Sequence, residues 1–119
     1  MPERKTIFIV EDEPMIGLML EDFLESLGYG LSGLADTLES GCSAARAGGF
    51  DAAILDCNLH GDKVWPVAEV LIEKNVPFLF ATGGSSDDIP AHFTACPTLE
   101  KPFTMANVES ALQQLFPDE

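Results

Sequence analysis

The chain has 119 residues, enough for one ordinary domain and too few for two. Because 46% of its residues are hydrophobic, it can bury a core, which argues against disorder. Twenty acidic residues against six lysines and arginines give a net charge of −14, which repels phosphate backbones and anionic lipid. We therefore expect neither nucleic-acid binding nor membrane binding.

The first apolar run and the cysteines indicate where the protein resides. Residues 7–10 form an apolar run of only four residues that leads straight into acids, so neither a signal peptide nor a membrane span is predicted. Cys42, Cys57 and Cys96 have no C-x-x-C spacing, which argues against a disulfide framework and a zinc site. We expect a cytoplasmic monomer with reduced thiols.

Short apolar runs alternate with helical patterns along the chain, beginning with a buried strand over residues 6–10. Pro14 opens a helix, since proline is favourable at the first helical position, and Gly28 ends it. The inward stripe of this helix is predicted to consist of Ile16, Leu20, Phe23, Leu24 and Leu27.

A weaker second strand is predicted over residues 29–35. Asp36 with Glu39 has the pattern of a helix cap, and the helix it opens extends to about Gly48. Gly41 lies inside that helix and is expected to weaken it by about 1 kcal/mol.

The third strand is predicted over residues 51–55. Pro66 opens a third helix, which Asn75 and Pro77 close. The fourth strand covers residues 78–81, an apolar run that reads as fully buried.

The segment 83–96 begins with glycine and contains Pro90, which disfavours helix before it. We predict a loop with a single helical turn that exchanges between conformations, in place of a full fourth helix. A short fifth strand follows over residues 98–100, and Thr104 caps a last helix. That helix is predicted to pack through Met105, Val108, Leu112 and Leu115.

Strands that alternate with helices predict an α/β fold with a parallel sheet covered on both faces. In such folds, ligands bind beyond the carboxyl ends of the strands. The polar residues found there are Glu11, Asp12, Glu13, Asp56, Thr82 and Lys101.

These residue types together predict phosphoryl transfer. Carboxylates that converge at a sheet edge require a cation, and hard oxygen ligands favour Mg²⁺ (magnesium). Asp12 and Asp56 can ligate the ion, and Asp56 can also attack phosphorus. Thr82 and Lys101 can hold the equatorial phosphoryl oxygens.

The segments "IFIVEDEP", "AILDCNLHG", "FLFATGG" and "LEKPF" resemble, in order and spacing, the signature segments of response-regulator receiver domains of the CheY-like family. The resemblance covers essentially the whole chain. It implies a doubly wound, flavodoxin-like sheet of five parallel strands in the order 2-1-3-4-5. It also implies a cis peptide bond between Lys101 and Pro102.

The resemblance further implies roles for individual residues. Asp56 is the expected phospho-acceptor, and Thr82 and Lys101 are expected to contact the phosphoryl group. The expected metal site consists of Asp56, Glu11, Asp12 and the backbone carbonyl of Asn58.

A narrower resemblance concerns "PFLFATGG" followed by "IPAHF", which looks like the FAT GUY subgroup of receivers. It implies a stand-alone receiver that serves a histidine kinase of the HWE or HisKA2 type in a general stress response. Gly84 and Ser85 depart from the subgroup, which often has an aromatic residue after the glycine. Thr98 stands where receivers usually carry an aromatic switch, which puts the usual signalling mechanism in doubt.

Plainer interpretations apply to several residues. Glu11 and Asp12, taken alone, are acids that favour a helix start. His60 and His92 lack the spacing of metal ligands and are expected in surface loops. Cys57 reads as a small buried residue. Trp65 is expected to pack at the start of the third helix.

We therefore expect residues 1–119 to be a single receiver domain with no output domain. It takes a phosphoryl group from a histidine kinase or histidine phosphotransferase, then binds an unknown downstream protein or drains phosphate. It is no enzyme beyond its own phosphorylation and dephosphorylation. One alternative is a small-molecule phosphatase, although Asn58 stands where such enzymes often carry a general acid. The other is a phosphorylation-independent binding module, which Thr98 keeps open.

Overall fold

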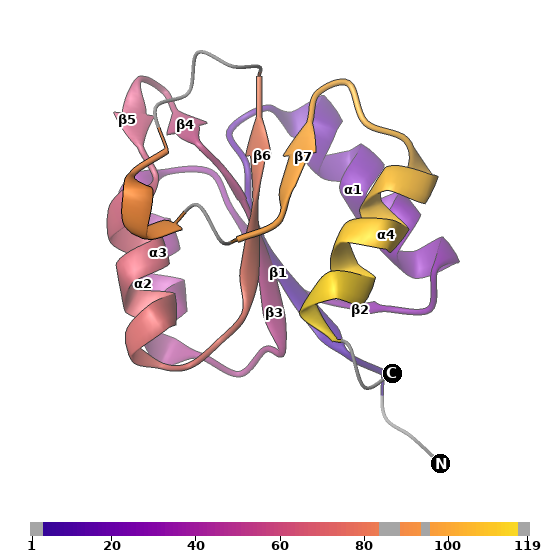
Figure 1. Ribbon diagram of the computed structural model, residues 1–119, viewed down its shortest axis with the longest axis horizontal. Coiled ribbons are helices and arrows are strands. Elements are labelled where there is room, and N and C mark those ends of the chain that lie inside the picture. Colours follow the sequence, from indigo (N-terminus) through magenta and orange to yellow (C-terminus); the bar gives the residue numbers. More distant parts are fainter. Residues whose placement is uncertain (1–3, 84–88, 94–95, 117–119) are drawn as a thin grey trace.

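A parallel sheet forms the centre of the computed structural model, which describes residues 4–83, 89–93 and 96–116 (Figure 1). Its five strands lie in the order β2-β1-β3-β6-β7, and every pair of neighbours is parallel. The strands are β1 (Thr6–Val10), β2 (Gly30–Ala35), β3 (Ala52–Asp56), β6 (Phe78–Thr82) and β7 (Thr98–Glu100). Counted along the chain, the order is second, first, third, fourth, fifth, which confirms the predicted fold.

Helices cover both faces of the sheet. Helices α1 (Pro14–Ser26) and α4 (Met105–Leu115) lie on one face, and α2 (Leu38–Ala47) and α3 (Trp65–Glu73) lie on the other (Figure 1). Among the described residues, none of the helices is long and apolar enough to cross a bilayer.

Strand β1 contributes to two cores because successive side chains of a strand point to opposite faces. Ile7 and Ile9 pack with Leu20, Leu24 and Leu112 of α1 and α4. Phe8 and Val10 belong to the second core, on the side of α2 and α3, whose other members include Ala45, Val67, Leu71 and Phe80. All four β1 side chains are at most 3% exposed. Burying a large apolar side chain contributes about 1.5–3 kcal/mol, so this strand anchors both layers.

The caps of α2 and α4 have the same design. The Thr37 hydroxyl accepts a hydrogen bond from the Ser40 backbone N–H at 3.0 Å, and Ser40 Oγ accepts one from the Thr37 N–H at 3.3 Å. The prediction that Asp36 and Glu39 form the cap is therefore wrong by one position. Thr37 is the cap residue, and Ser40 takes the reciprocal role that a glutamate usually has. Thr104 caps α4 as predicted, in a reciprocal arrangement with Asn107.

One residue of α4 departs from the predicted packing, and the packing of α2 explains one of its glycines. Met105 is 41% exposed, so the packed stripe of α4 begins at Val108 rather than at Met105. Gly41 lies where α2 approaches its neighbours closely. A Cβ there would come within 3.2 Å of a Val67 methyl carbon and 3.4 Å of a Val10 methyl carbon, so packing accounts for this glycine.

A small hairpin between β3 and α3 was not predicted. Strands β4 (Asn58–Leu59) and β5 (Asp62–Lys63) pair antiparallel around His60 and Gly61. The φ angles of these two turn residues are 50° and 91°, as a type I′ turn requires. Histidine and glycine both tolerate this region of backbone conformation, so the dipeptide was a turn signal.

The segment between β6 and β7 contains one short helical turn, the 3₁₀ helix η1 (Ala91–Phe93). This agrees with the predicted single turn, whereas residues 84–88 and 94–95 of that prediction lie outside the described residues. Phe93 is 1% exposed and packs 5.6 Å from Phe80 and 6.0 Å from Trp65, measured between ring centroids. Trp65 thus packs at the start of α3, as expected.

Candidate functional site

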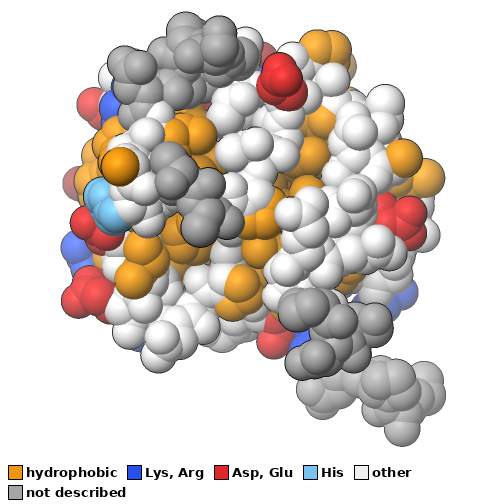
Figure 2. Space-filling view, in the orientation of Figure 1, with side chains coloured by type: hydrophobic (Ala, Val, Ile, Leu, Met, Phe, Trp, Pro, Cys, Tyr) orange, Lys and Arg blue, Asp and Glu red, His pale blue; other side chains and the backbone are white. Residues whose placement is uncertain are grey.

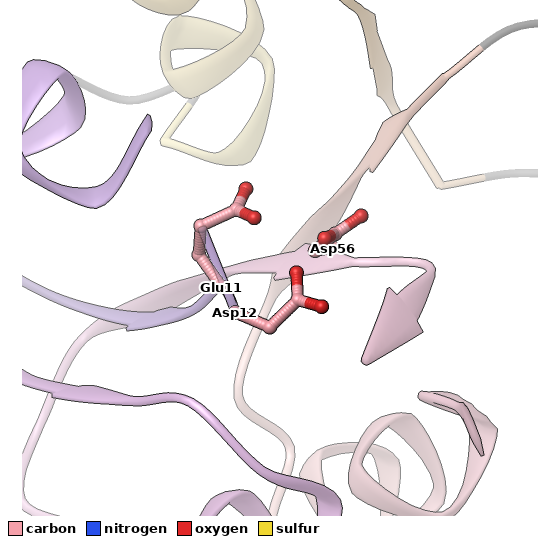
Figure 3. A group of neighbouring side chains, drawn as sticks. All are labelled: Glu11, Asp12 and Asp56. Carbon is pink, nitrogen blue, oxygen red and sulfur yellow. The ribbon is translucent and has the colours of Figure 1, made fainter. Parts of the chain in front are cut away.

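The carboxyl ends of two central strands, β1 and β3, bring acidic side chains together. Glu11 and Asp12 directly follow β1, and Asp56 is the last residue of β3. One carboxylate oxygen from each residue lies within 4.8 Å of the other two. Figure 3 shows these side chains side by side beyond the strand ends. Glu11 and Asp56 are buried, and Asp12 is half-buried.

Lys101 brings a positive charge to the same place. Its ammonium Nζ lies 3.3 Å from Glu11 Oε1 and 3.4 Å from Asp56 Oδ2. The Lys101 backbone N–H donates to the Thr82 carbonyl at 2.9 Å, so the end of β6 positions it. The Lys101–Pro102 peptide is cis, which confirms the expectation. Burial alone would lower the pKa of Lys101, but the charges of Asp56 and Glu11 raise it.

The carboxylates differ in their affinity for a proton. Burial, and then the neighbouring Glu11, raise the pKa of Asp56 from 3.8 to about 8, against the opposing charge of Lys101. Burial would also raise the pKa of Asp12, but hydrogen bonds from the His60 backbone and with Asp56 lower it below its ordinary value. In the absence of a bound cation, the cluster therefore relieves its charge by holding a proton on Asp56.

The donor set fits a hard divalent cation. Three carboxylates face a single ammonium group, and Glu11 Oε1 is fully buried without a hydrogen-bond partner in the described part of the chain, although Lys101 lies nearby. Mg²⁺ prefers such oxygen ligands and usually takes one or two carboxylates. Glu11, Asp12 and Asp56 could therefore hold the ion.

A recess of about 360 Å³ opens over the cluster. It is lined by Asp12, Glu13, Asp56, Asn58, His60, Gly61, Gly83 and Lys101. A Cβ at Gly83 would meet no atom of the described residues within 4 Å, so these residues leave room beside it. The recess is large enough for a phosphoryl group and its ligands.

The predicted site residues do not all lie in the recess. Asp12, Asp56, Asn58 and Lys101 line it. The Asn58 backbone N–H also reaches Asp56 Oδ1, at 3.5 Å. Glu11 is buried next to Asp56 and Lys101. Thr82 lies at the same sheet edge and is 6% exposed, and its neighbour Gly83 lines the recess.

His60 was missed as a site residue. Its side chain is 61% exposed, as predicted for a surface loop, but its backbone N–H donates to Asp12 Oδ2 at 2.9 Å. Its ring atom Nδ1 lies 3.6 Å from the same oxygen. The His60–Gly61 turn was the available signal, because a tight turn returns the chain towards the strand end that carries Asp56.

The strand order, with carboxylates at the carboxyl edge of the sheet, defines a doubly wound α/β protein of the flavodoxin-like class. No family model matches the sequence. The solution structure of SdrG from Sphingomonas melonis Fr1 is 50% identical, with a TM-score of 0.87, over 98% of this chain and 99% of that one. The chain therefore belongs to the family of CheY-like response-regulator receiver domains.

Three further comparisons extend this result. The BeF3-activated conformation of SdrG, from Pseudomonas melonis Fr1, is 49% identical with a TM-score of 0.80, over 97% of this chain and 98% of that one. The transcriptional activator protein IrlR of Burkholderia pseudomallei is 37% identical over 87 residues, 70% of this chain. The match covers 35% of IrlR, so the chain spans about a third of this curated relative.

The receiver domain of the sensor histidine kinase PA1611 from Pseudomonas aeruginosa PAO1 shares the fold. It is 22% identical with a TM-score of 0.81, over 97% of this chain and 99% of that one. That domain was crystallised with a magnesium ion coordinated in its active-site cleft.

Proposed function

We propose that this receiver accepts a phosphoryl group from a phosphohistidine onto Asp56 and then loses it to water. The observation that carries the proposal is the position of Asp56, which shares one recess with Asp12 and with Lys101, 3.4 Å away. The donor is a histidine kinase or a histidine phosphotransferase. The SdrG relative has a BeF3-activated conformation, which supports phosphoryl chemistry in this family branch.

The proposed transfer is an in-line displacement. A carboxylate oxygen of Asp56 forms a bond to phosphorus while the phosphorus–nitrogen bond of the donor breaks, and the imidazole nitrogen keeps the electron pair. Lys101 neutralises charge on the phosphoryl oxygens, and the Thr82 hydroxyl donates to one of them. In hydrolysis, a water oxygen bonds to phosphorus and Asp56 leaves as a carboxylate, which releases inorganic phosphate.

We propose that Mg²⁺ is held by Asp56, Asp12, Glu11 and the backbone carbonyl of Asn58. When bound, the ion neutralises charge on the carboxylates and on the phosphoryl oxygens. It also favours the ionised form of Asp56, which the attack on phosphorus requires. The convergence of the Glu11, Asp12 and Asp56 carboxylates within 4.8 Å of one another supports this assignment.

At the level of the cell, we propose that residues 1–119 act as a single cytoplasmic receiver that binds a downstream protein or drains phosphate. The match to SdrG covers 99% of that chain, which supports this size. The FAT GUY-like segment includes the buried strand β6 and Gly83, which lines the recess. It supports a general stress response fed by a kinase of the HWE or HisKA2 type.

A second candidate is a receiver-like module that binds its partner without phosphate. Thr98 is exposed on β7, in the position where an aromatic switch usually stands. The acidic cluster around Asp56 favours the first candidate, because it places three carboxylates together at an energetic cost that a passive binding module does not require.

The experiment that tests the proposal is phosphotransfer to the purified protein. We expect a panel of autophosphorylated histidine kinases to contain one that transfers label in the presence of Mg²⁺, and acetyl phosphate to raise the intact mass by one phosphoryl group. Asp56→Asn keeps the shape of the side chain and should fold but remain unmodified. Full phosphorylation of Asp56→Asn would place the acceptor elsewhere. Failure of every donor on the wild-type protein would favour the phosphate-independent module.

A further inference from the structure

The β4–β5 hairpin brings an imidazole ring to the rim of the acidic cluster. Asn58↔Lys63 and Leu59↔Asp62 pair across the hairpin, and the Val64 N–H donates to the Cys57 carbonyl at 3.0 Å behind it. This places His60 beside Asp12, with Nδ1 at 3.6 Å from Oδ2, and His60 lines the same recess as Asp56.

The contacts of Lys101 indicate which side of the cluster has room for a cation. The ammonium group lies 3.3 to 3.8 Å from Glu11, Asp56 and Glu13. Like charges repel, so a metal ion is held best away from Lys101, near Asp12, which has no ion pair with Lys101 among the described residues. His60 is on that side, because both its backbone N–H and its Nδ1 approach Asp12.

We propose that His60 contributes a nitrogen ligand to the divalent-ion site and so raises its preference for first-row transition-metal ions such as Co²⁺ over Mg²⁺. This inference rests on the proposed function in one respect, namely that the recess binds a divalent ion. Imidazole suits transition metals, whereas Mg²⁺ favours oxygen ligands and retains its waters.

The geometry permits such coordination. Two ligands at about 2.0–2.2 Å from one ion lie roughly 3 Å apart. The Nδ1–Oδ2 distance of 3.6 Å needs only a small adjustment, and the His60 side chain is 61% exposed. The backbone N–H of His60 also orients Asp12, as groups that hydrogen-bond to metal ligands commonly do.

A plainer role for His60 is a surface ion pair with Asp12, and the two roles make different predictions. If the imidazole only pairs with the Asp12 carboxylate, its removal should change the affinities for Mg²⁺ and Co²⁺ by the same factor, because both ions compete with the same ion pair. If the imidazole is a nitrogen ligand, its removal should instead lower the affinity for Co²⁺ and leave the affinity for Mg²⁺ unchanged.

The test is calorimetric titration of Mg²⁺ and of Co²⁺ into wild-type protein, His60→Asn and His60→Gly, all at the same pH. Asparagine and glycine both tolerate the positive φ of this position and keep the backbone N–H. We expect Co²⁺ affinity to fall at least about tenfold in both variants, the scale of losing one metal-orienting group, with Mg²⁺ affinity unchanged. The visible absorption of bound Co²⁺ should shift as a nitrogen ligand is lost.

His92→Asn is the matched control, because His92 is 58% exposed and lies 3.5 Å from Glu69, an acid on α3 outside the recess. It should alter neither affinity. Equal losses for both ions in the His60 variants, or no loss for either, would overturn the nitrogen ligand while Mg²⁺ binding and phosphotransfer to Asp56 still stood. If the wild-type protein bound neither ion, this inference and the proposed metal site would both be wrong.

Discussion

Asp56 is held in a state that opposes its proposed reactivity until a cation arrives. Burial and Glu11 raise its pKa to about 8, so at neutral pH the metal-free carboxyl holds a proton for most of the time. A protonated acid is a poor nucleophile and a poor ligand. Binding of a cation should release that proton, which couples the metal to the readiness of the acceptor.

This shifted pKa predicts the pH dependence of stability. Between pH 3.8 and about 8, the folded protein binds the Asp56 proton more tightly than the unfolded chain does. The contribution of Asp56 to the free energy of unfolding is therefore fully present below pH 3.8 and is lost as pH rises towards 8. Urea unfolding of metal-free protein should show this decline.

Asp56→Asn should remove that component of the decline and be the more stable protein at the upper end of the range, by about 1–3 kcal/mol, because a buried carboxylate beside Glu11 is costly to ionise. Asp22→Asn, at an exposed position on α1, serves as the control and should keep the wild-type pH dependence. Identical pH profiles for wild type and Asp56→Asn would contradict the raised pKa.

Asp12 is predicted to act as a metal ligand rather than as a general source of charge. Asp12→Ala should weaken Mg²⁺ binding by at least about tenfold and prevent beryllofluoride from binding at moderate Mg²⁺ concentrations. Calorimetry measures both. Asp62→Ala removes the same charge from the exposed strand β5 and should have little effect. Beryllofluoride binding that persists in excess chelator would exclude the proposed metal site.

At the scale of single elements, α2 depends on its cap. Its residues include Gly41 and several small side chains, so few large apolar contacts hold it, and the Thr37–Ser40 pair satisfies its first backbone groups. Thr37→Ala should lower the free energy of unfolding by about 1 kcal/mol in urea titrations. Thr37→Ser keeps the hydroxyl and should lose much less. Equal losses in the two variants would mean that the methyl group, rather than the cap, stabilises this end.

Helix η1 is predicted to respond to phosphorylation. Three residues make a helix far too short to be stable alone, and Phe93 anchors it among Trp65, Phe78 and Phe80. We expect the amides of Ala91–Phe93 to exchange with deuterium faster than those of β6 in the free protein. Beryllofluoride with Mg²⁺ should slow them. Strong protection of η1 in the free protein, unchanged by beryllofluoride, would contradict this ordering.

At the scale of the whole molecule, backbone contacts connect the site to β7 and so to the surface formed by β7 and α4. Lys101 N–H bonds to the Thr82 carbonyl, and Thr82 pairs with Glu100 across β6 and β7. On the face shown in Figure 2, acidic side chains are scattered around the margin, as expected for solvated carboxylates. A net charge of −14 favours repulsion between molecules. We therefore expect a recognition surface to be defined by particular elements, not by the overall acidity.

Phosphorylation is therefore expected to move amide resonances of β7 and α4 more than those of α2. Heteronuclear NMR spectra recorded with and without beryllofluoride and Mg²⁺ test this, and α2 is the internal reference. Shifts on β7 and α4 would support partner binding through that face. An unchanged face, with Asp56 still modified, would favour the phosphate-draining role.

Local patterns were enough to predict the five strands of the main sheet, the four α-helices that the structure describes and the acidic residues and lysine of the site. A buried strand reads as an apolar run, and parallel strands place their carboxyl ends at one edge, so the sequence alone predicts that Asp12, Asp56 and Lys101 lie together. Thr104 as a cap and the single turn near Phe93 also follow from nearby residues, because caps and short helices depend on interactions within a few positions.

The remaining features depend on residues that are distant in the chain and meet only in the folded protein. Asp12 and His60 are 48 positions apart, and their hydrogen bond exists because the β4–β5 hairpin turns back over β1. The raised pKa of Asp56 depends on how deeply the fold buries it beside Glu11. Electrostatic energies vary with distance and burial, which residue spacing does not specify, so only the tertiary structure decided the charge state of this site and the place of His60 beside it.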